Sequence, residues 1–454
     1  MIDTTIAAIS TAMQNSGISV IRVSGKKAID ICDRVFKAKS GKNLSEMKGY
    51  TAAFGSVYSK GEMIDECIAT VFLEPHSYTG ENVVELSCHG GLCVTKEVLR
   101  ALFENGAVAA GAGEFTKRAF LNSKLDLIEA QAVMDIINAK SKNAVKAAIK
   151  IKEGALSKRI QSIKQDLSQK AAHLCAWADY PEEDIPQVSF SNLKEALTEA
   201  ENKLKVILEQ YDNGKILKDG INTVIVGKPN VGKSTLMNLL SGYDKSIITD
   251  IPGTTRDIVE ENVNLGNITL NLSDTAGIRY SKDLVEQIGV DKAKERLKTA
   301  SLVLCVFDLA ESLSDEDRQI LSLIDGTNSI AIFNKSDLDK KLDTKEIESK
   351  VKSKVYMSAK FDNVDVLKKE IERVCEITDF DENESLIYNE RQRSLTLNAK
   401  KSVREAIDAL DMGITLDAVT VSIEDAISSL AELTGENVTD SIIDQVFHSF
   451  CVGK

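Results

Sequence analysis

Apolar residues in the first quarter of the chain occur in short runs separated by polar turns. Runs of strand length cover residues 18–23, 51–57, 67–73 and 83–87. They predict β-strands, because a half-buried or buried strand needs apolar side chains over about this length. Gly90-Gly91 follows the last run and opens a stretch with helical spacing up to about Asn105. We therefore expect a compact α/β domain over residues 1–121.

The apolar spacing changes to a helical period after this domain. Residues 125–211 contain almost no glycine or proline, apart from an acidic, two-proline interruption at 180–186 that predicts a connection. Helical spacing returns in the last part of the chain, at residues 386–410, 416–433 and 439–447.

The two helical stretches, 122–216 and 381–454, form either one domain around an inserted segment or two separate bundles. One domain is the simpler prediction, because insertions succeed where the two ends of the inserted segment lie close together. Asn213-Gly214 and Asp219-Gly220 are expected to bracket the start of the insert, which spans residues 217–380.

The insert begins with an apolar run at 221–226 and continues with Gly-Lys-Pro-Asn-Val-Gly-Lys-Ser at 227–234. A strand, a glycine-bearing loop and a helix start in this order predict a phosphate-binding loop, whose backbone N–H groups point at a triphosphate. Lys233 would reach the β- and γ-phosphates, and the Ser234 hydroxyl would bind Mg²⁺.

Three further motifs each follow a strand pattern. Asp274-Thr275-Ala276-Gly277 is suited to metal-bound water and the γ-phosphate, and the Asp337 carboxylate of Asn334-Lys335-Ser336-Asp337 can accept both guanine N–H donors. Ser358-Ala359-Lys360 can buttress the base through the Ala359 N–H. Each motif alone could be a polar turn, but in this order at strand ends they predict a Ras-like P-loop G domain that prefers GTP.

Ile278 follows the Asp-x-x-Gly motif, where small switch GTPases carry a water-orienting glutamine. Water positioning and positive charge must therefore come from elsewhere. The carbonyl of Asn230 could hold a monovalent cation, with K⁺ in a loop over residues 249–254, and Glu286 could orient a water. By spacing alone, a loop-stabilising amide and a solvated helix residue remain open alternatives for these two positions.

Composition narrows the class of protein. The eight cysteines are scattered, without Cys-x-x-Cys or zinc spacing, and no run is long enough to span a bilayer, so we expect a reduced, cytoplasmic protein. The net charge of −13 opposes general binding to nucleic acid. Lys142, Lys146 and Lys150 share one face of a predicted helix, and this face is either a phosphate-backbone contact for tRNA or simply solvated.

Four segments are more specific than a general GTPase pattern. They cover residues 77–91, 113–127, 253–257 and the tail Phe450-Cys451-Val452-Gly453-Lys454. Together they resemble the tRNA-modifying GTPase family MnmE, also called TrmE, over essentially the full length. The chain departs from the family pattern at residues 12–16 and at Gly111-Ala112, and the resemblance places both near a folate-binding site.

The resemblance implies an α/β multidomain protein. Its parts would be an N-terminal folate-binding and dimerising domain, an all-α helical domain built from both flanks, and the inserted G domain. It implies K⁺-activated GTP hydrolysis in a homodimer and a complex with the flavoprotein MnmG (GidA), a heterotetramer or larger. The reaction would add a carboxymethylaminomethyl-type group to the wobble uridine of certain tRNAs, with 5-formyl- or methylene-tetrahydrofolate as one-carbon donor. A ribosome-assembly or RNA-binding switch GTPase without modifying activity is the alternative.

The resemblance also assigns residues by position. Asn230, Glu286 and Lys233 would be catalytic, with Glu286 positioning water. Mg²⁺ would be bound by Ser234 and Thr255, and K⁺ by Asn230, Thr249, Ile251 and Thr254. Arg22, Glu85, Lys124 and Lys454 would contact folate, and Cys451 is a possible reactive thiol. The complete GTP-binding set would be Asn230, Val231, Gly232, Lys233, Ser234, Thr235, Thr249, Asp250, Ile251, Pro252, Gly253, Thr254, Thr255, Asp274, Thr275, Ala276, Gly277, Asn334, Lys335, Asp337, Ser358, Ala359 and Lys360.

Overall fold

The chain is described from a computed structural model that covers residues 4–179, 189–243, 260–266, 268–273, 297, 300–375 and 387–454. It forms two compact units. Unit 1 comprises Met1–Met134, Ile151–Asn202 and Leu395–Lys454, and unit 2 comprises Asp135–Lys150 and Lys203–Ser394. The sequence predicted four segments with other boundaries than these two units, and that division stays a prediction.

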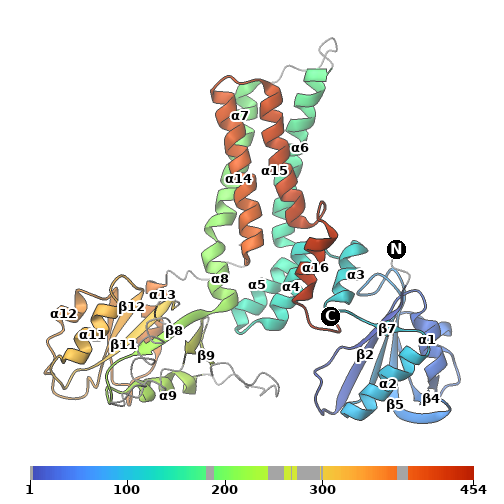
Figure 1. Ribbon diagram of the computed structural model, residues 1–454, viewed down its shortest axis with the longest axis horizontal. Coiled ribbons are helices and arrows are strands. Elements are labelled where there is room, and N and C mark those ends of the chain that lie inside the picture. The colour runs from blue at the N-terminus through green and yellow to red at the C-terminus, as the bar shows by residue number, and fades with distance from the viewer. Residues whose placement is uncertain are drawn as a thin grey trace, which may run out of the picture. The chain divides into compact units, whose positions relative to one another are not determined.

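Unit 1 contains a seven-stranded sheet with the strand order β3-β4-β5-β6-β2-β1-β7, drawn in blue in Figure 1. Neighbouring strands are antiparallel except β1 and β7, which are parallel. The strands are β1 Ile6–Ile9, β2 Ile18–Ser24, β3 Phe36–Ala38, β4 Thr51–Ser59, β5 Glu62–Phe72, β6 Val83–His89 and β7 Val108–Ala109. The four predicted strands are confirmed as β2, β4, β5 and β6.

Helices cover one face of this sheet. Residues of α1, Ala28–Val35, and α2, Leu92–Glu104, form one apolar core with Cys67, Ala69 and Val71 of β5. Because side chains alternate between the two faces of a strand, Ile68 and Thr70 lie on the face opposite this core. A short 3₁₀ helix η1 spans Leu44–Glu46, and α3 spans Glu114–Leu121.

The helical part of unit 1 combines segments that are far apart in the sequence. Helices α6 and α15 pack along each other, and the Lys164 ammonium is paired with the Glu436 carboxylate. Arg404 Nε donates to Glu201 Oε1 at 3.0 Å. The bounds are α4 Leu127–Asn138, α6 Ala155–Asp179, α7 Phe190–Glu209, α14 Glu390–Asp411, α15 Leu416–Thr434 and α16 Asp440–His448. This packing is the arrangement expected for one helical domain rather than two bundles.

Unit 2 is built on a six-stranded sheet with the order β13-β12-β11-β8-β10-β9. Only β9 is antiparallel to its neighbour, and apolar cores cover both faces. The strands are β8 Ile221–Val226, β9 Glu260–Leu265, β10 Ile268–Ser273, β11 Leu302–Asp308, β12 Ser329–Asn334 and β13 Ser353–Tyr356. The helices are α5 Lys142–Lys152, α8 Tyr211–Asp219, α9 Lys233–Tyr243, α11 Asp315–Leu323, α12 Lys345–Glu348 and α13 Asp365–Val374. The predicted fold class, an α/β multidomain protein with a helical domain and a P-loop G domain, is confirmed.

The chain enters the predicted insert through a helix that is followed by a turn at a single glycine. Asn213-Gly214 lies inside helix α8, where a Cβ on Gly214 would come within 2.5 Å of the Ile387 carbonyl oxygen. Close packing thus explains this glycine better than a turn does. The chain turns into β8 at Gly220, which has a φ of +78°. No helix in the described ranges is long and apolar enough to cross a membrane.

Candidate nucleotide-binding site

The loop between β8 and α9 has the backbone conformation of a phosphate cradle. Asn230 and Gly232 have φ angles of +65° and +100°, in the left-handed region that turns the chain sharply. A Cβ on Gly232 would lie 2.2 Å from Asn334 Nδ2, so only glycine fits there. Helix α9 begins at Lys233, which places the N–H groups of its first turn beside the loop. Ser234 and Thr235 are exposed on this turn.

The Lys233 ammonium lies inside the loop. It donates to the carbonyl oxygens of Gly227 at 2.6 Å and Lys228 at 2.7 Å. Burial lowers the pKa of Lys233, because its half-buried cation has lost part of its hydration. Neutral carbonyl oxygens replace only part of that hydration, so an anion would stabilise the ammonium further.

Asn334 joins the phosphate loop to the loop after β13. Its Nδ2 donates to the Val231 carbonyl oxygen at 2.7 Å, and its Oδ1 accepts from the Ala359 N–H at 2.9 Å. The side chain is only 3% exposed. The Ala359 N–H therefore holds Asn334, whereas the sequence analysis assigned this group to the guanine base.

The proposed guanine side of the site is open. Asp337 and Lys360 are exposed, Ser358 is buried, and the Ser358 N–H donates to Asp362 Oδ2 at 2.6 Å. Lys335 has a φ of +61°, and its ammonium is paired with the buried Asp308 carboxylate. Asp308 was not predicted from the sequence, although an aspartate that ends an apolar run at the edge of a parallel sheet is a recognisable signal.

Part of the predicted nucleotide set lies outside the described residues. These positions are Thr249, Asp250, Ile251, Pro252, Gly253, Thr254, Thr255, Asp274, Thr275, Ala276, Gly277 and Glu286. The structure brings together the other members, from Asn230 to Thr235 and from Asn334 to Lys360, at the carboxyl ends of β8, β12 and β13.

Three of the four predicted folate residues meet in unit 1. Arg22 and Glu85 are cross-strand partners on β2 and β6, and Arg22 Nε donates to Glu85 Oε1 at 2.8 Å. The Lys454 pKa is lowered by burial and by the positive charge of Arg22. The Lys124 ammonium instead donates to the Pro75 carbonyl oxygen at 3.1 Å, and no contact among the described residues joins it to the other three.

Tail residues hold this cluster in place. The Gly453 carbonyl oxygen accepts from the Ser10 hydroxyl at 3.1 Å, and the Phe115 N–H donates to the Lys454 carbonyl oxygen at 3.2 Å. Gly453 has a φ of +95°, and a Cβ there would lie 2.3 Å from the Ile9 carbonyl oxygen. The thiol-bearing residue Cys451 is exposed.

Two family profiles match successive parts of the sequence. The profile described as the GTP-binding protein TrmE N-terminus matches residues 5–124, and the MnmE helical domain profile matches residues 127–451. The chain belongs to the MnmE family of tRNA modification GTPases. Relatives named tRNA modification GTPase MnmE share 40% identity in Clostridioides difficile (strain 630) and 38% in Geobacillus thermodenitrificans (strain NG80-2). The alignments cover 100% and 99%, respectively, of this chain and of each relative.

The family is one of GTPases, and the 227–234 loop is the candidate nucleotide site of this chain. The family match also draws attention to two aromatic residues that the sequence analysis quoted within motifs but gave no role. The Arg22 guanidinium lies over the rings of Tyr78 and Phe115, at 5.5 Å from each centroid. Their position inside two of the MnmE-like segments, residues 77–91 and 113–127, was the signal that could have found them.

Proposed function

We propose that this chain is a K⁺-activated, dimerisation-dependent GTPase that modifies tRNA together with the flavoprotein MnmG (GidA). The reaction adds a carboxymethylaminomethyl-type group to the wobble uridine and takes a one-carbon unit from a tetrahydrofolate derivative. The observation that carries the proposal is the half-buried Lys233 in a loop whose glycine is fixed against Asn334. Such a loop favours a polyphosphate over other anions, because several N–H donors converge on it.

The donor set fits Mg²⁺·GTP. Lys233 would contact the β- and γ-phosphates, and the exposed Ser234 hydroxyl together with Thr255 would bind Mg²⁺. Asp337 would accept the two guanine N–H donors. The loop after β13 would then be the base loop, and the two hydrogen bonds of the Asn334 side chain, the amide brace, would hold it at a fixed position relative to the phosphate loop. The metal neutralises charge that develops on the phosphates.

The Asn230 side chain is exposed on a left-handed residue directly beside the phosphate loop, which fits a monovalent-cation ligand. Thr249, Ile251 and Thr254 would complete the site, and Glu286 would position the attacking water. A bound K⁺ supplies the positive charge that other GTPases take from an arginine.

The Arg22, Glu85 and Lys454 cluster fits a ligand that carries both N–H donors and carboxylates. One Glu85 oxygen holds Arg22, so its second oxygen is available to a pterin N–H. The flanking rings of Tyr78 and Phe115 would exclude water from such a ligand. We include Lys124 in this site on the basis of its motif alone.

An exposed apolar face supports a homodimer. Phe54 and Ile68 are cross-strand neighbours on the sheet face away from α1 and α2, and they are 49% and 47% exposed. Paired apolar residues left open on a sheet are typical of a protein interface. The lysine face of α5 is the proposed tRNA contact, and a cytoplasmic location agrees with that substrate.

Two assays test the proposal. Purified protein should hydrolyse GTP much faster in KCl than in NaCl of equal ionic strength, and equal rates would remove the cation mechanism. Mass spectrometry of tRNA nucleosides from cells without the protein should show loss of the wobble modification. Unchanged nucleosides would favour the alternative of an RNA-binding switch GTPase.

A further inference from the structure

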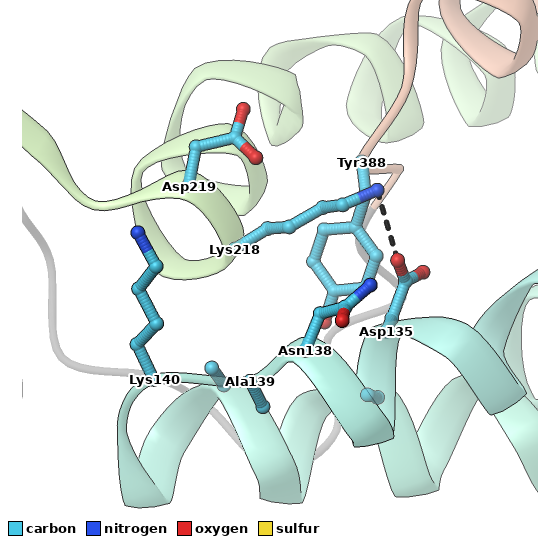
Figure 2. A pocket seen from close by; sticks show the side chains of 9 residues that line it. Asp135, Asn138, Ala139, Lys140, Lys218, Asp219 and Tyr388 are labelled. Carbon is cyan, nitrogen blue, oxygen red and sulfur yellow. Dashed lines mark ion pairs between the residues drawn. The ribbon is translucent and has the colours of Figure 1, made fainter. Parts of the chain in front are cut away.

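Unit 2 contains a cavity of about 220 Å³ whose lining includes no residue of the phosphate loop. It is bounded by the end of α4, by α5, by the end of α8 and by Tyr388, which precedes α14 (Figure 2). At about 30 Å³ per water, this space holds about seven waters or a ligand of a few carbon atoms. Neither the GTPase reaction nor the folate cluster uses any of its lining residues.

Tyr388 gives the cavity an unused hydrogen-bonding group. The residue is 4% exposed, and its hydroxyl is buried without a hydrogen-bond partner among the described residues. Its backbone N–H donates to Gln392 Oε1 at 3.0 Å, which anchors the backbone from which the buried ring extends. A buried hydroxyl without a partner is destabilising, and phenylalanine would fill the same space. The hydroxyl is therefore explained if it bonds to a molecule that is not part of the chain.

The two lysines at the cavity provide hydrogen-bond donors that an anion can use. Lys218 Nζ lies 2.8 Å from Asp135 Oδ1, and Lys140 Nζ lies 3.2 Å from the side-chain oxygens of both Asn262 and Asn271. Each ammonium has three N–H donors, so these contacts leave at least one on each lysine.

The lining is donor-rich as a result. Figure 2 shows the Asp219 carboxylate directed away from α4 and the Lys218 ammonium paired with Asp135, so the donors left to a ligand are the remaining N–H groups of Lys140 and Lys218.

Small apolar residues create the remaining space. Ala144 and Ala148 of α5 are buried and line the cavity, and their methyl groups offer hydrocarbon contacts but no hydrogen bonds. Inorganic phosphate would leave this wall without a partner. A short aliphatic carboxylate matches both parts of the lining.

We propose that this cavity binds a small aliphatic carboxylate, with its anionic oxygens between Lys140, Lys218 and the Tyr388 hydroxyl and its alkyl part against Ala144 and Ala148. The ligand would also act on the G-domain sheet. Asn271 of β10 accepts from Lys140 and donates to the Asp219 carbonyl oxygen at 2.7 Å, so the cavity wall is bonded to the strand that leads to Asp274.

Propionate is the probe, and propionamide is its neutral isostere. Ligand-observed NMR on the full chain, with excess Mg²⁺·GDP so that propionate does not bind the phosphate loop, should show saturable propionate binding with a Kd on the order of 1 mM. Propionamide should bind at least tenfold more weakly. Absence of saturable propionate binding, or equal binding of the amide, would overturn the proposal.

Tyr388→Phe locates the site, because it removes one oxygen atom and no packing volume. It should weaken propionate binding about fivefold while leaving thermal stability unchanged or slightly higher. Lys140→Met should weaken binding about tenfold or more. Lys194→Met, which breaks an exposed ion pair with Asp411 in unit 1, is the matched control and should leave propionate binding unchanged. Equal binding by wild type and Tyr388→Phe would refute the site even if the protein binds propionate elsewhere.

Discussion

Replacement of Asn334 by alanine tests whether the amide brace holds the nucleotide site in shape. The substitution removes the donor to the Val231 carbonyl oxygen and the acceptor of the Ala359 N–H. Both backbone groups are buried and belong to different loops of the site. The change therefore separates the phosphate loop from the base loop without touching a residue expected to contact the phosphates.

The magnitude follows from the two lost partners. A buried backbone group without a partner costs about 1–3 kcal/mol, so two such groups cost about 2–6 kcal/mol. Water that enters the space left by the side chain recovers part of this, which leaves about 2–4 kcal/mol. If this cost falls on the loop geometry that nucleotide binding requires, the Kd for GDP rises roughly 30-fold to 700-fold, since 1.4 kcal/mol corresponds to a factor of ten.

Titration with a fluorescent GDP analogue measures this Kd directly. Asn328→Ala is the matched control, since Asn328 lies just before the same strand and makes an exposed bond to Lys352 at 2.5 Å. The control should stay within about twofold of the wild-type Kd, because exposed bonds contribute little. If Asn334→Ala also binds GDP within threefold of wild type, the brace does not maintain the site.

The remaining predictions concern the assigned roles in GTP hydrolysis. Lys233→Ala should abolish detectable GTP binding, because its ammonium is the charged donor inside the loop; retention of micromolar affinity in a filter-binding assay would contradict this. Glu286→Ala should keep GTP affinity but raise the hydrolysis barrier by about 2–4 kcal/mol, seen as a matching fall in single-turnover rate; an unchanged rate would remove its assignment to water. Asp337→Asn should reduce the preference for GTP over xanthosine triphosphate, measured by competition, and an unaltered preference would exclude Asp337 from base recognition.

The sequence predicted those parts of the fold that local chemistry determines. The β8–loop–α9 unit follows from an apolar run, a glycine-bearing loop and a helix start. The short strands β3 and β7 were not predicted, because two or three residues carry no periodicity and become strands only by pairing with their neighbours. Helix α8 was missed because contact with Ile387, distant in sequence, overrides the turn preference of Asn213-Gly214.

The candidate site likewise has residues that the local sequence predicts and contacts that depend on distant parts of the chain. Motif spacing identified Lys233, Asn334 and Asp337, because each motif is contiguous in the sequence. The partners that fix these residues come from other strands. Asp308 meets Lys335 only because β11 and β12 are parallel and in register, and Arg22 meets Tyr78 and Phe115 only after the sheet of unit 1 forms.

The packing of α6 against α15 has a consequence for the order of folding. The pairs Lys164–Glu436 and Glu201–Arg404 join residues that stand more than 200 positions apart on either side of the inserted segment. During synthesis the early helices therefore emerge long before their partners, with apolar faces uncovered. Unit 2 can complete its sheet in the meantime, and the helical bundle closes only when residues 395–454 have left the ribosome. Chaperone demand should accordingly be greatest in that interval.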